Sequence, residues 1–210
     1  VTDYDNAYTL EDWRDPLHPY HAVCAKHGIP TNMSPSCTRD MKLYTINSYK
    51  KANGLKDADV AIGIRTDEMR RVRAGATKDN IVYPLVDWWP ADKEDVLDFW
   101  QDYEWDLTIP EHLGNCVSCF KKSDKKLFMA HNEMPEVFEF NKEMERLYGR
   151  QNYRHRVKGL EGSSVFFRGG RSTIEIIDGF SLMDENIARQ LSDRSDGNCS
   201  ESCEMYATEV

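Results

Sequence analysis

Hydrophobic residues spaced three and four positions apart predict three helices in this chain. The first is expected over about 37–50, directly after Ser36, a residue type that favours helix N-termini. The second is expected over 96–103, where apolar residues occupy positions i, i+3, i+4 and i+7 behind several acids. The third is expected over 136–148, and Gly149 is typical of a helix end.

Shorter apolar runs predict β-strands. Residues 58–64 (ADVAIGI) are almost continuously apolar, which is typical of a buried strand in a parallel sheet. Residues 81–88 predict a second strand, which Pro84 should confine to a sheet edge or interrupt with a bulge. Strand, charged loop, strand and helix in this order indicate an α/β architecture. Residues 1–35 are rich in Pro and Gly and predict loops, and 168–180 predict a turn before a short apolar segment.

Composition favours a protein with a packed core that lies outside membranes. The chain has 210 residues, of which 40% are hydrophobic. No apolar run approaches the ~18 residues of a membrane span. The first residues, VTDYDNAYTLEDW, have neither the basic start nor the apolar stretch of a signal peptide, so we expect a cytoplasmic protein. Because no Met stands at position 1, we expect a longer protein that continues upstream.

The net charge of −9 argues against broad, nonspecific binding to nucleic acids. Residues 184–210 carry seven acids against Arg189 and Arg194, so this tail alone contributes −5. We expect the tail to be acidic and loosely ordered. A total says nothing about distribution, so a local basic cleft remains compatible with the sequence.

The chain contains six cysteines, two of which form the CxxC pair Cys116 and Cys119. In a reducing compartment, grouped thiols serve more often as metal ligands or redox groups than as structural disulfides. A CxxC pair supplies two metal ligands at most, so a metal site needs two further ligands from elsewhere. Cys199 and Cys203 lie in the acidic tail, where neighbouring acids raise a thiol pKa and disfavour a reactive nucleophile.

Three stretches occur together in an order that resembles a known family. They are SPSCTRDMK (34–42), IGIRTDEMRR (62–71) and YPLVDWWPADKEDVLDFW (83–100). They resemble the CT, Gly-x-Arg-x-Asp-Glu and PL elements of the phosphoadenosine-phosphosulfate (PAPS) reductase-like family, within the adenine nucleotide α-hydrolase superfamily. IPEHLGNCVSCFKKS (109–123) and the closing RGGRS and CSESCE resemble its phage-encoded branch. The resemblance spans nearly the whole chain and implies a protein that is encoded by a phage or a bacterium.

This resemblance implies a parallel-sheet, HUP-type α/β fold that is incomplete at its N-terminus. Residues 1–110 would form a partial nucleotide-binding domain, 111–183 its cysteine-containing helical part, and 184–210 the acidic tail. The family's Ser-Gly-Gly-x-Asp-Ser phosphate loop is absent, and RGGRST at 168–173 lies at the wrong end of the chain and lacks the acid. The Glu-Cys-Gly-x-His tail of true sulfonucleotide reductases is absent as well. We therefore expect the missing loop upstream of Val1 or on another polypeptide.

The resemblance also implies a four-cysteine metal site. Its ligands would be Cys24, Cys37, Cys116 and Cys119. Four thiolates suit a [4Fe–4S] cluster, which fits the family better, or zinc, which fits the spacing equally well. Basic side chains near them in sequence, Arg39, Lys121 and Lys122, would favour the thiolate form. The alternative is that Cys24 and Cys37 are ordinary small buried residues and that the CxxC pair is a lone dithiol.

A second candidate site follows the first expected strand. Ligands of open α/β sheets bind beyond the carboxyl ends of the strands, which is where the 63–71 loop begins. The candidate anion-binding residues are Lys42, Gly63, Arg65, Asp67, Glu68 and Arg71. Gly63 would let backbone approach a ligand, and arginines grip phosphate or sulfate bidentately. The alternative is that Arg65 pairs with Asp67 or Glu68 and that the loop is merely solvated.

Together these features suggest a protein that binds an adenine nucleotide or sulfonucleotide, PAPS or ATP, beside the cysteine site. Two enzymatic chemistries fit: reductive cleavage of a sulfonucleotide, and adenylyl-activated sulfur transfer. A thiol-redox partner and a homo-oligomer are compatible with either chemistry, and no membrane partner is expected. The rival is a non-catalytic metal-binding structural or regulatory subunit. No histidine is assigned to a metal, and surface or capping roles are expected for His18, His21 and His27. Trp88 and Trp89 are expected to pack against the sheet.

Overall fold

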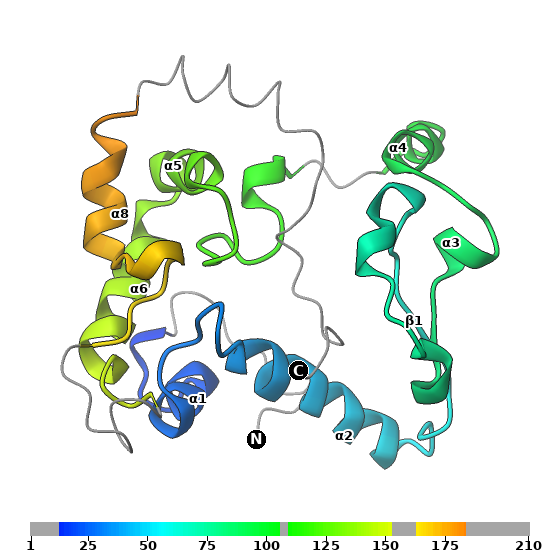
Figure 1. Ribbon diagram of the computed structural model, residues 1–210, viewed down its shortest axis with the longest axis horizontal. Coiled ribbons are helices and arrows are strands. Elements are labelled where there is room, and N and C mark those ends of the chain that lie inside the picture. Colours follow the sequence, from blue (N-terminus) through cyan, green and yellow to red (C-terminus); the bar gives the residue numbers. More distant parts are fainter. Residues whose placement is uncertain (1–12, 106–108, 153–162, 184–210) are drawn as a thin grey trace.

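The computed structural model describes residues 13–105, 109–152 and 163–183 (Figure 1). The helices of this part are α1 (Pro19–His27), α2 (Tyr44–Ala52), α3 (Pro84–Asp87), α4 (Lys93–Gln101), α5 (Asp124–Glu133), α6 (Pro135–Tyr148) and α8 (Thr173–Phe180). The strands are β1 (Val60–Ala61) and β2 (Ile81–Val82). Shorter turns are the π-helical η2 (Cys37–Leu43) and the 3-10 turns η3 (Thr66–Arg71), η4 (Ala76–Asp79), η5 (Glu111–Leu113) and η6 (Arg168–Gly170). No helix among these residues is long and apolar enough to cross a membrane.

The main hydrophobic core lies where α1, α5, α6 and α8 pack together (Figure 1). Phe138 and Met144 of α6 are fully buried at its centre, next to Leu127 of α5 and Ile176 of α8. The predicted helix over 136–148 is confirmed, since burial of one face stabilises the periodic pattern of α6. Cys24 of α1 belongs to the same core.

The two strands pair in parallel, with Val60 opposite Ile81 and Ala61 opposite Val82. The parallel pairing expected from the sequence is confirmed, and the described chain is mixed α/β. Both strands are shorter than predicted, and Ala61 is exposed, so the prediction that the whole segment 58–64 forms a buried strand is wrong. Burial begins at Ile64, which packs in a small second core around the sheet.

Pro84 ends the second strand, where the sequence predicted continuation to residue 88. Proline has no amide N–H for the sheet, and its fixed φ suits the first turn of a helix, so α3 begins there. Trp88 and Trp89 follow α3 with 54% and 70% of their surface exposed. The prediction that these tryptophans pack against the sheet is therefore wrong.

The N-terminal region contains a helix where the Pro and Gly content predicted loops. Pro19 occupies the first turn of α1, and the Nδ1 atom of His18 accepts a hydrogen bond from the Tyr20 amide at 3.2 Å. The helix predicted over 37–50 is confirmed, but it starts as the π-helical turn η2 before α2. Ser36 makes no side-chain cap there and is buried instead.

Helix α4 is confirmed, but its apolar face remains open. Asp92 caps its N-terminus in a reciprocal capping box with Asp95. Phe99 and Tyr103 pack against Trp100, yet both keep about half of their surface exposed. The helical spacing of apolar residues thus predicted this helix correctly. The same spacing does not show whether the apolar face is buried, and in the described part of the chain it stays largely exposed.

The segment predicted as a turn and a short apolar run contains helix α8. Ser172 caps it in a reciprocal capping box with Glu175. The carboxylate of Glu145, on α6, accepts hydrogen bonds from the amides of Thr173 at 3.0 Å and Phe166 at 2.9 Å. One carboxylate therefore fastens the first turn of α8 to α6, and its negative charge suits a helix N-terminus.

Replacing Glu145 with alanine is expected to lower the free energy of unfolding by about 1–3 kcal/mol, because the Phe166 and Thr173 amides lose their acceptor. Glu145→Gln should cost less, since its amide oxygen still accepts. Urea unfolding of both variants and the wild type measures the difference. Equal stabilities of the alanine variant and the wild type would contradict the role of Glu145 in fastening α8.

The wild type and the Glu145→Gln variant also test how stability depends on pH. Burial raises the pKa of the Glu145 carboxyl above its ordinary value. Its contribution to stability is therefore fully present below the ordinary carboxyl pKa and is lost as the pH rises through the folded-state value. The wild type should gain stability relative to Glu145→Gln as the pH falls from about 7 toward 4. A difference that is independent of pH would contradict the raised pKa.

Candidate functional site

The loop that follows β1 contains five of the six predicted anion-site residues. Gly63 is exposed, and a side chain built on it would meet no atom within 4 Å, so its backbone is accessible. Arg65 forms a two-pronged ion pair with Asp67, with N–O distances of 2.9 and 2.8 Å. This hydrogen-bonded guanidinium holds the pKa of the Asp67 carboxyl below its usual value.

Glu68 lies beside this pair and is almost fully buried, with 4% of its side chain exposed. Its carboxylate forms an ion pair with Arg71 and lies 3.7 Å from the guanidinium of Arg65. Glu68 also closes the capping box at the start of η3 through the Arg65 amide. The two predicted arginines are therefore held side by side on one buried carboxylate.

The sequence left open whether Arg65 serves an anion or pairs with its acidic neighbours, and the structure shows the pairing. The two guanidiniums of Arg65 and Arg71 face two carboxylates, so these four side chains together carry no net charge. The two carboxylates differ in exposure, since 33% of the Asp67 side chain is exposed and Glu68 is buried. Asp67 is therefore the partner that an incoming anion could replace, whereas Glu68 would keep both arginines in position.

Lys42, the sixth predicted anion-site residue, lies in η2 and is half-buried. That turn packs against α1, the helix that carries Cys24, and continues into α2. Lys42 thus shares its element with Cys37, five residues earlier, so the two predicted sites are linked along the chain.

The four predicted metal ligands come from three elements that meet around Tyr20 of α1. Cys24 lies one turn further along α1, Cys37 begins η2, and Cys116 and Cys119 flank a turn closed by a backbone hydrogen bond of 3.1 Å. Burial raises the pKa of the Tyr20 phenol, and the nearby thiols, all four of them, raise it further. Cys37 and Cys116, which are 79 residues apart in sequence, therefore both lie within electrostatic range of the Tyr20 phenol.

These thiols differ in exposure. Cys24 and Cys119 are buried, Cys37 is half-buried and Cys116 is exposed. Burial, followed by the neighbouring Cys37, raises the pKa of the Cys24 thiol strongly. Buried thiols close together resist ionisation unless a cation compensates the charge, and a bound metal ion reverses this preference.

Within residues 13–105, 109–152 and 163–183, no three His, Cys, Asp or Glu side chains stand in a metal-binding arrangement. The four cysteines lie near Tyr20, but their side chains do not form a coordination shell. The chemistry of the four cysteines still fits either expected metal site, because four thiolates can ligate zinc or a [4Fe–4S] cluster.

Two of the basic residues expected near the thiolates have other partners. Arg39 donates to Asp40 at 2.8 Å and lies close to His27. Lys122 is buried and donates to the backbone carbonyl of His112, while Arg168 donates to the carbonyl of Lys122. These bonds fasten the segment after the CxxC pair, a structural role that no local pattern in the sequence indicates.

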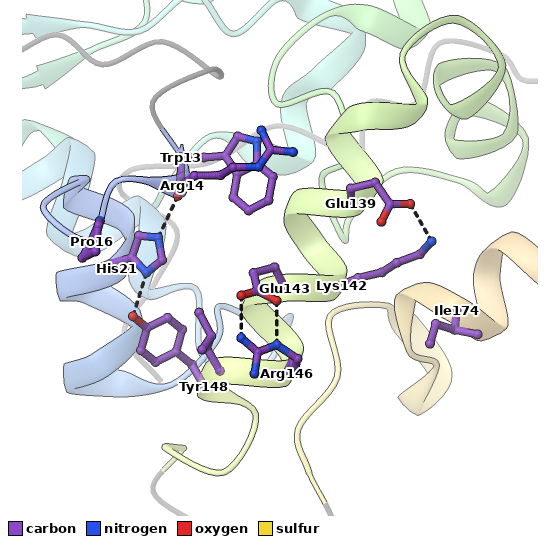
Figure 2. A pocket seen from close by; sticks show the side chains of 11 residues that line it. Trp13, Arg14, Pro16, His21, Glu139, Lys142, Glu143, Arg146, Tyr148 and Ile174 are labelled. Carbon is purple, nitrogen blue, oxygen red and sulfur yellow. Dashed lines mark hydrogen bonds and ion pairs between the residues drawn. The ribbon is translucent and has the colours of Figure 1, made fainter.

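A hollow of about 900 Å³ between α1 and α6 was not predicted (Figure 2). His21 bridges its wall, with Nδ1 2.7 Å from the Tyr148 hydroxyl and Nε2 2.7 Å from the Trp13 carbonyl. His21 is buried, so the expectation of surface or capping roles holds for His18 but is wrong for His21. The ion pair of Glu143 with Arg146 lines the same hollow.

The site and fold define an α/β protein with grouped cysteines, and the comparisons place it in a family. An uncharacterized nin region protein of Escherichia phage lambda, ORF290, is 31% identical over 217 positions, which cover 98% of this chain and 72% of that protein. The chain belongs to the family of this phage protein. The phage origin expected from the sequence is thereby supported. No protein-family model matches the chain, and no solved structure matches it.

Proposed function

We propose that the chain is a PAPS reductase-like protein of HUP-type fold that binds an adenine nucleotide or sulfonucleotide beside a cysteine-ligated metal site. The observation that carries the proposal is the meeting of four cysteines from three elements around Tyr20. If these cysteines only filled space in the core, all of them should be buried. Cys37 is instead half-buried and Cys116 is exposed. The motifs that resemble the family supply the nucleotide part of the proposal.

The metal would be held by Cys24, Cys37, Cys116 and Cys119. Bound there, zinc would link α1, η2 and the CxxC turn, and an iron–sulfur cluster would in addition carry electrons. The family resemblance favours the cluster.

The nucleotide's phosphate or sulfate would lie beyond the carboxyl end of β1, on Arg65 and Arg71. Its anionic oxygens would replace the exposed carboxylate of Asp67 on the Arg65 guanidinium. Buried Glu68 would keep the two guanidiniums aligned during this exchange, which lowers the cost of ordering them. The Gly63 backbone and Lys42 complete the proposed anion site.

Two reactions remain compatible with this arrangement: reductive cleavage of a sulfonucleotide and adenylyl-activated sulfur transfer, in either case in the host cytoplasm. The second candidate function is a non-catalytic metal-binding subunit. The observation that favours it is the pairing of Arg65 with Asp67, which already satisfies the guanidinium without a ligand.

Calorimetry with PAPS and with ATP separates the two functions, using this chain and a version extended upstream. The enzyme proposal expects binding of at least one nucleotide by at least one version. If neither version binds either nucleotide, the nucleotide proposal is wrong and the metal-binding subunit stands.

Arg65→Gln is expected to weaken nucleotide binding about 10- to 100-fold, because a charge-assisted contact contributes about 1.5–3 kcal/mol. The matched control is Arg70→Gln, a neighbouring arginine that is exposed and outside the proposed site. The control should bind as the wild type does. Equal losses in both variants would show that only overall charge matters and would exclude a specific contact with Arg65.

A further inference from the structure

A basic region lies at the opposite end of the sheet from Arg65. A hollow of about 650 Å³ opens between α2 and the amino ends of the two strands. Its cationic lining residues are Lys50, Lys51, Lys56 and Arg73. We call this surface the basic hollow. The amide of Val60 donates to the carbonyl of Asn80 at 2.7 Å beside it, which marks the amino end of the β1–β2 pair.

The charge of the basic hollow contrasts with that of the whole protein. Four cations and one carboxylate, Asp79, line it, which gives a local charge of +3 in a chain of net charge −9. Asp79 forms an ion pair with Arg73. Asp57 and Asp59 lie on the neighbouring loop but are exposed and do not line the hollow.

The lysines of the hollow retain their charge for a ligand. The ammonium group of Lys50 donates to the carbonyl of Ala58 at 2.7 Å, a neutral acceptor that holds the side chain without neutralising it. Lys51 and Lys56 are exposed. Asn47 and Asn80 add amide groups that can donate hydrogen bonds to anionic oxygens.

We propose that the basic hollow binds the phosphodiester backbone of a nucleic acid. Lysines act as point charges and do not impose the two-pronged geometry of arginine, and the one arginine here is engaged by Asp79. Exposed lysines spread over an open hollow suit successive backbone phosphates better than one enclosed small anion, because counterion release needs charge density and little fixed geometry. This proposal does not rest on the nucleotide or metal sites.

The test is fluorescence anisotropy of single-stranded oligonucleotides of about 6 and 18 nucleotides with the full chain. Three phosphate contacts would weaken binding about 20-fold between 50 and 200 mM salt, at a slope of about 0.7 per contact. Affinity should rise with oligonucleotide length, since a longer backbone offers more registers and contacts. No binding of the longer oligonucleotide at 50 mM salt would overturn the proposal.

The diagnostic variant combines Lys50→Gln, Lys51→Gln and Lys56→Gln. It should weaken binding at least ~10-fold at low salt and reduce the salt slope by about 2. The matched control combines Lys26→Gln, Lys93→Gln and Lys142→Gln, which change the net charge equally at other sites and should alter affinity less than about twofold. Equal weakening in both triple variants would overturn a specific site.

Two further measurements exclude loss of folding and binding of a small anion as explanations. Lys51→Gln with Lys56→Gln spares the Lys50–Ala58 bond, so it excludes loss of folding as the cause and should still lower the salt slope by about 1 or more. Inorganic pyrophosphate tests the small-anion alternative: displacement of both oligonucleotides at equal, low concentration, without length dependence, would contradict a backbone site. Cys116→Ser should bind oligonucleotide normally, which separates this outcome from failure of the proposed function.

Discussion

Replacing Gly28 with alanine is expected to lower the free energy of unfolding by about 3–5 kcal/mol, one of the largest effects of any small substitution in this chain. Gly28 ends α1 with φ of 79° and ψ of −178°, a backbone conformation that is essentially restricted to glycine. A Cβ atom there would also overlap the side chain and backbone nitrogen of Asn152. Strain and overlap add, because neither can be relieved without moving buried backbone.

The consequence reaches the cysteine group. The Gly28 amide donates to the carbonyl of Cys24 at 2.7 Å, and the Asn152 side chain donates to the carbonyl of Ile29 at 3.3 Å. A shift of Gly28 therefore moves the last turn of α1, which carries Cys24. Thermal unfolding should show a midpoint lowered by about 10 °C.

Two other glycines separate the two causes. Gly63→Ala meets no atom within 4 Å and needs no left-handed backbone, so its stability should be unchanged within about 0.5 kcal/mol. Gly54→Ala also meets no atom but has φ of 69°, so it should show the backbone strain alone, about 1 kcal/mol. If Gly28→Ala costs no more than Gly54→Ala, the close contact with Asn152 is not important for stability.

Local pattern predicted the helices of this chain better than its sheet. Helix α6 was predictable because its apolar spacing is repeated over about four turns and one face is buried. The strands were not, since an apolar run such as 58–64 shows that a segment avoids water but not how many neighbouring strands cover it. Pro84 predicted an interruption within a strand, although the same fixed φ starts α3.

For the candidate sites, the sequence identified residue types but not their partners. The pairing of Arg65 with Asp67 was foreseeable as an alternative, because the two residues lie only two positions apart. The buried position of Lys122 was not foreseeable, since it depends on His112 and Arg168, which the fold brings from other elements. The basic hollow likewise requires the sheet to bring Arg73 beside the lysines of α2.

Replacing Cys24 or Cys116 with serine is expected to remove the metal from the protein. The wild type, purified without oxygen, should contain one zinc ion or one iron–sulfur cluster per chain. Loss of a ligand should lower affinity by more than the ~10- to 100-fold that loss of an outer-shell partner causes. Iron, zinc and sulfide analysis and the visible absorption spectrum measure the outcome. A colourless protein with one zinc per chain would exclude the iron–sulfur cluster.

Ser118→Ala is the matched control, because Ser118 lies between the cysteines of the CxxC pair and its hydroxyl donates to Asn141 at 3.1 Å. It should alter the turn slightly and leave the metal content unchanged. If Cys116→Ser also left the metal content unchanged, both the zinc and the iron–sulfur proposals would be wrong.

Cys24 gives the sharpest version of this test, because it is fully buried and could simply fill space in the core. A space-filling role and a ligand role predict different responses to a chelator. If Cys24 only packs, Cys24→Ser should lower the unfolding temperature equally with and without chelator. If Cys24 binds metal, chelator should lower the unfolding temperature of the wild type and have little further effect on the variant, since stabilisation by a ligand disappears with the ligand. The comparison thus decides whether the buried thiol of Cys24, which lies near Cys37 and Tyr20, is part of the core or part of a metal site.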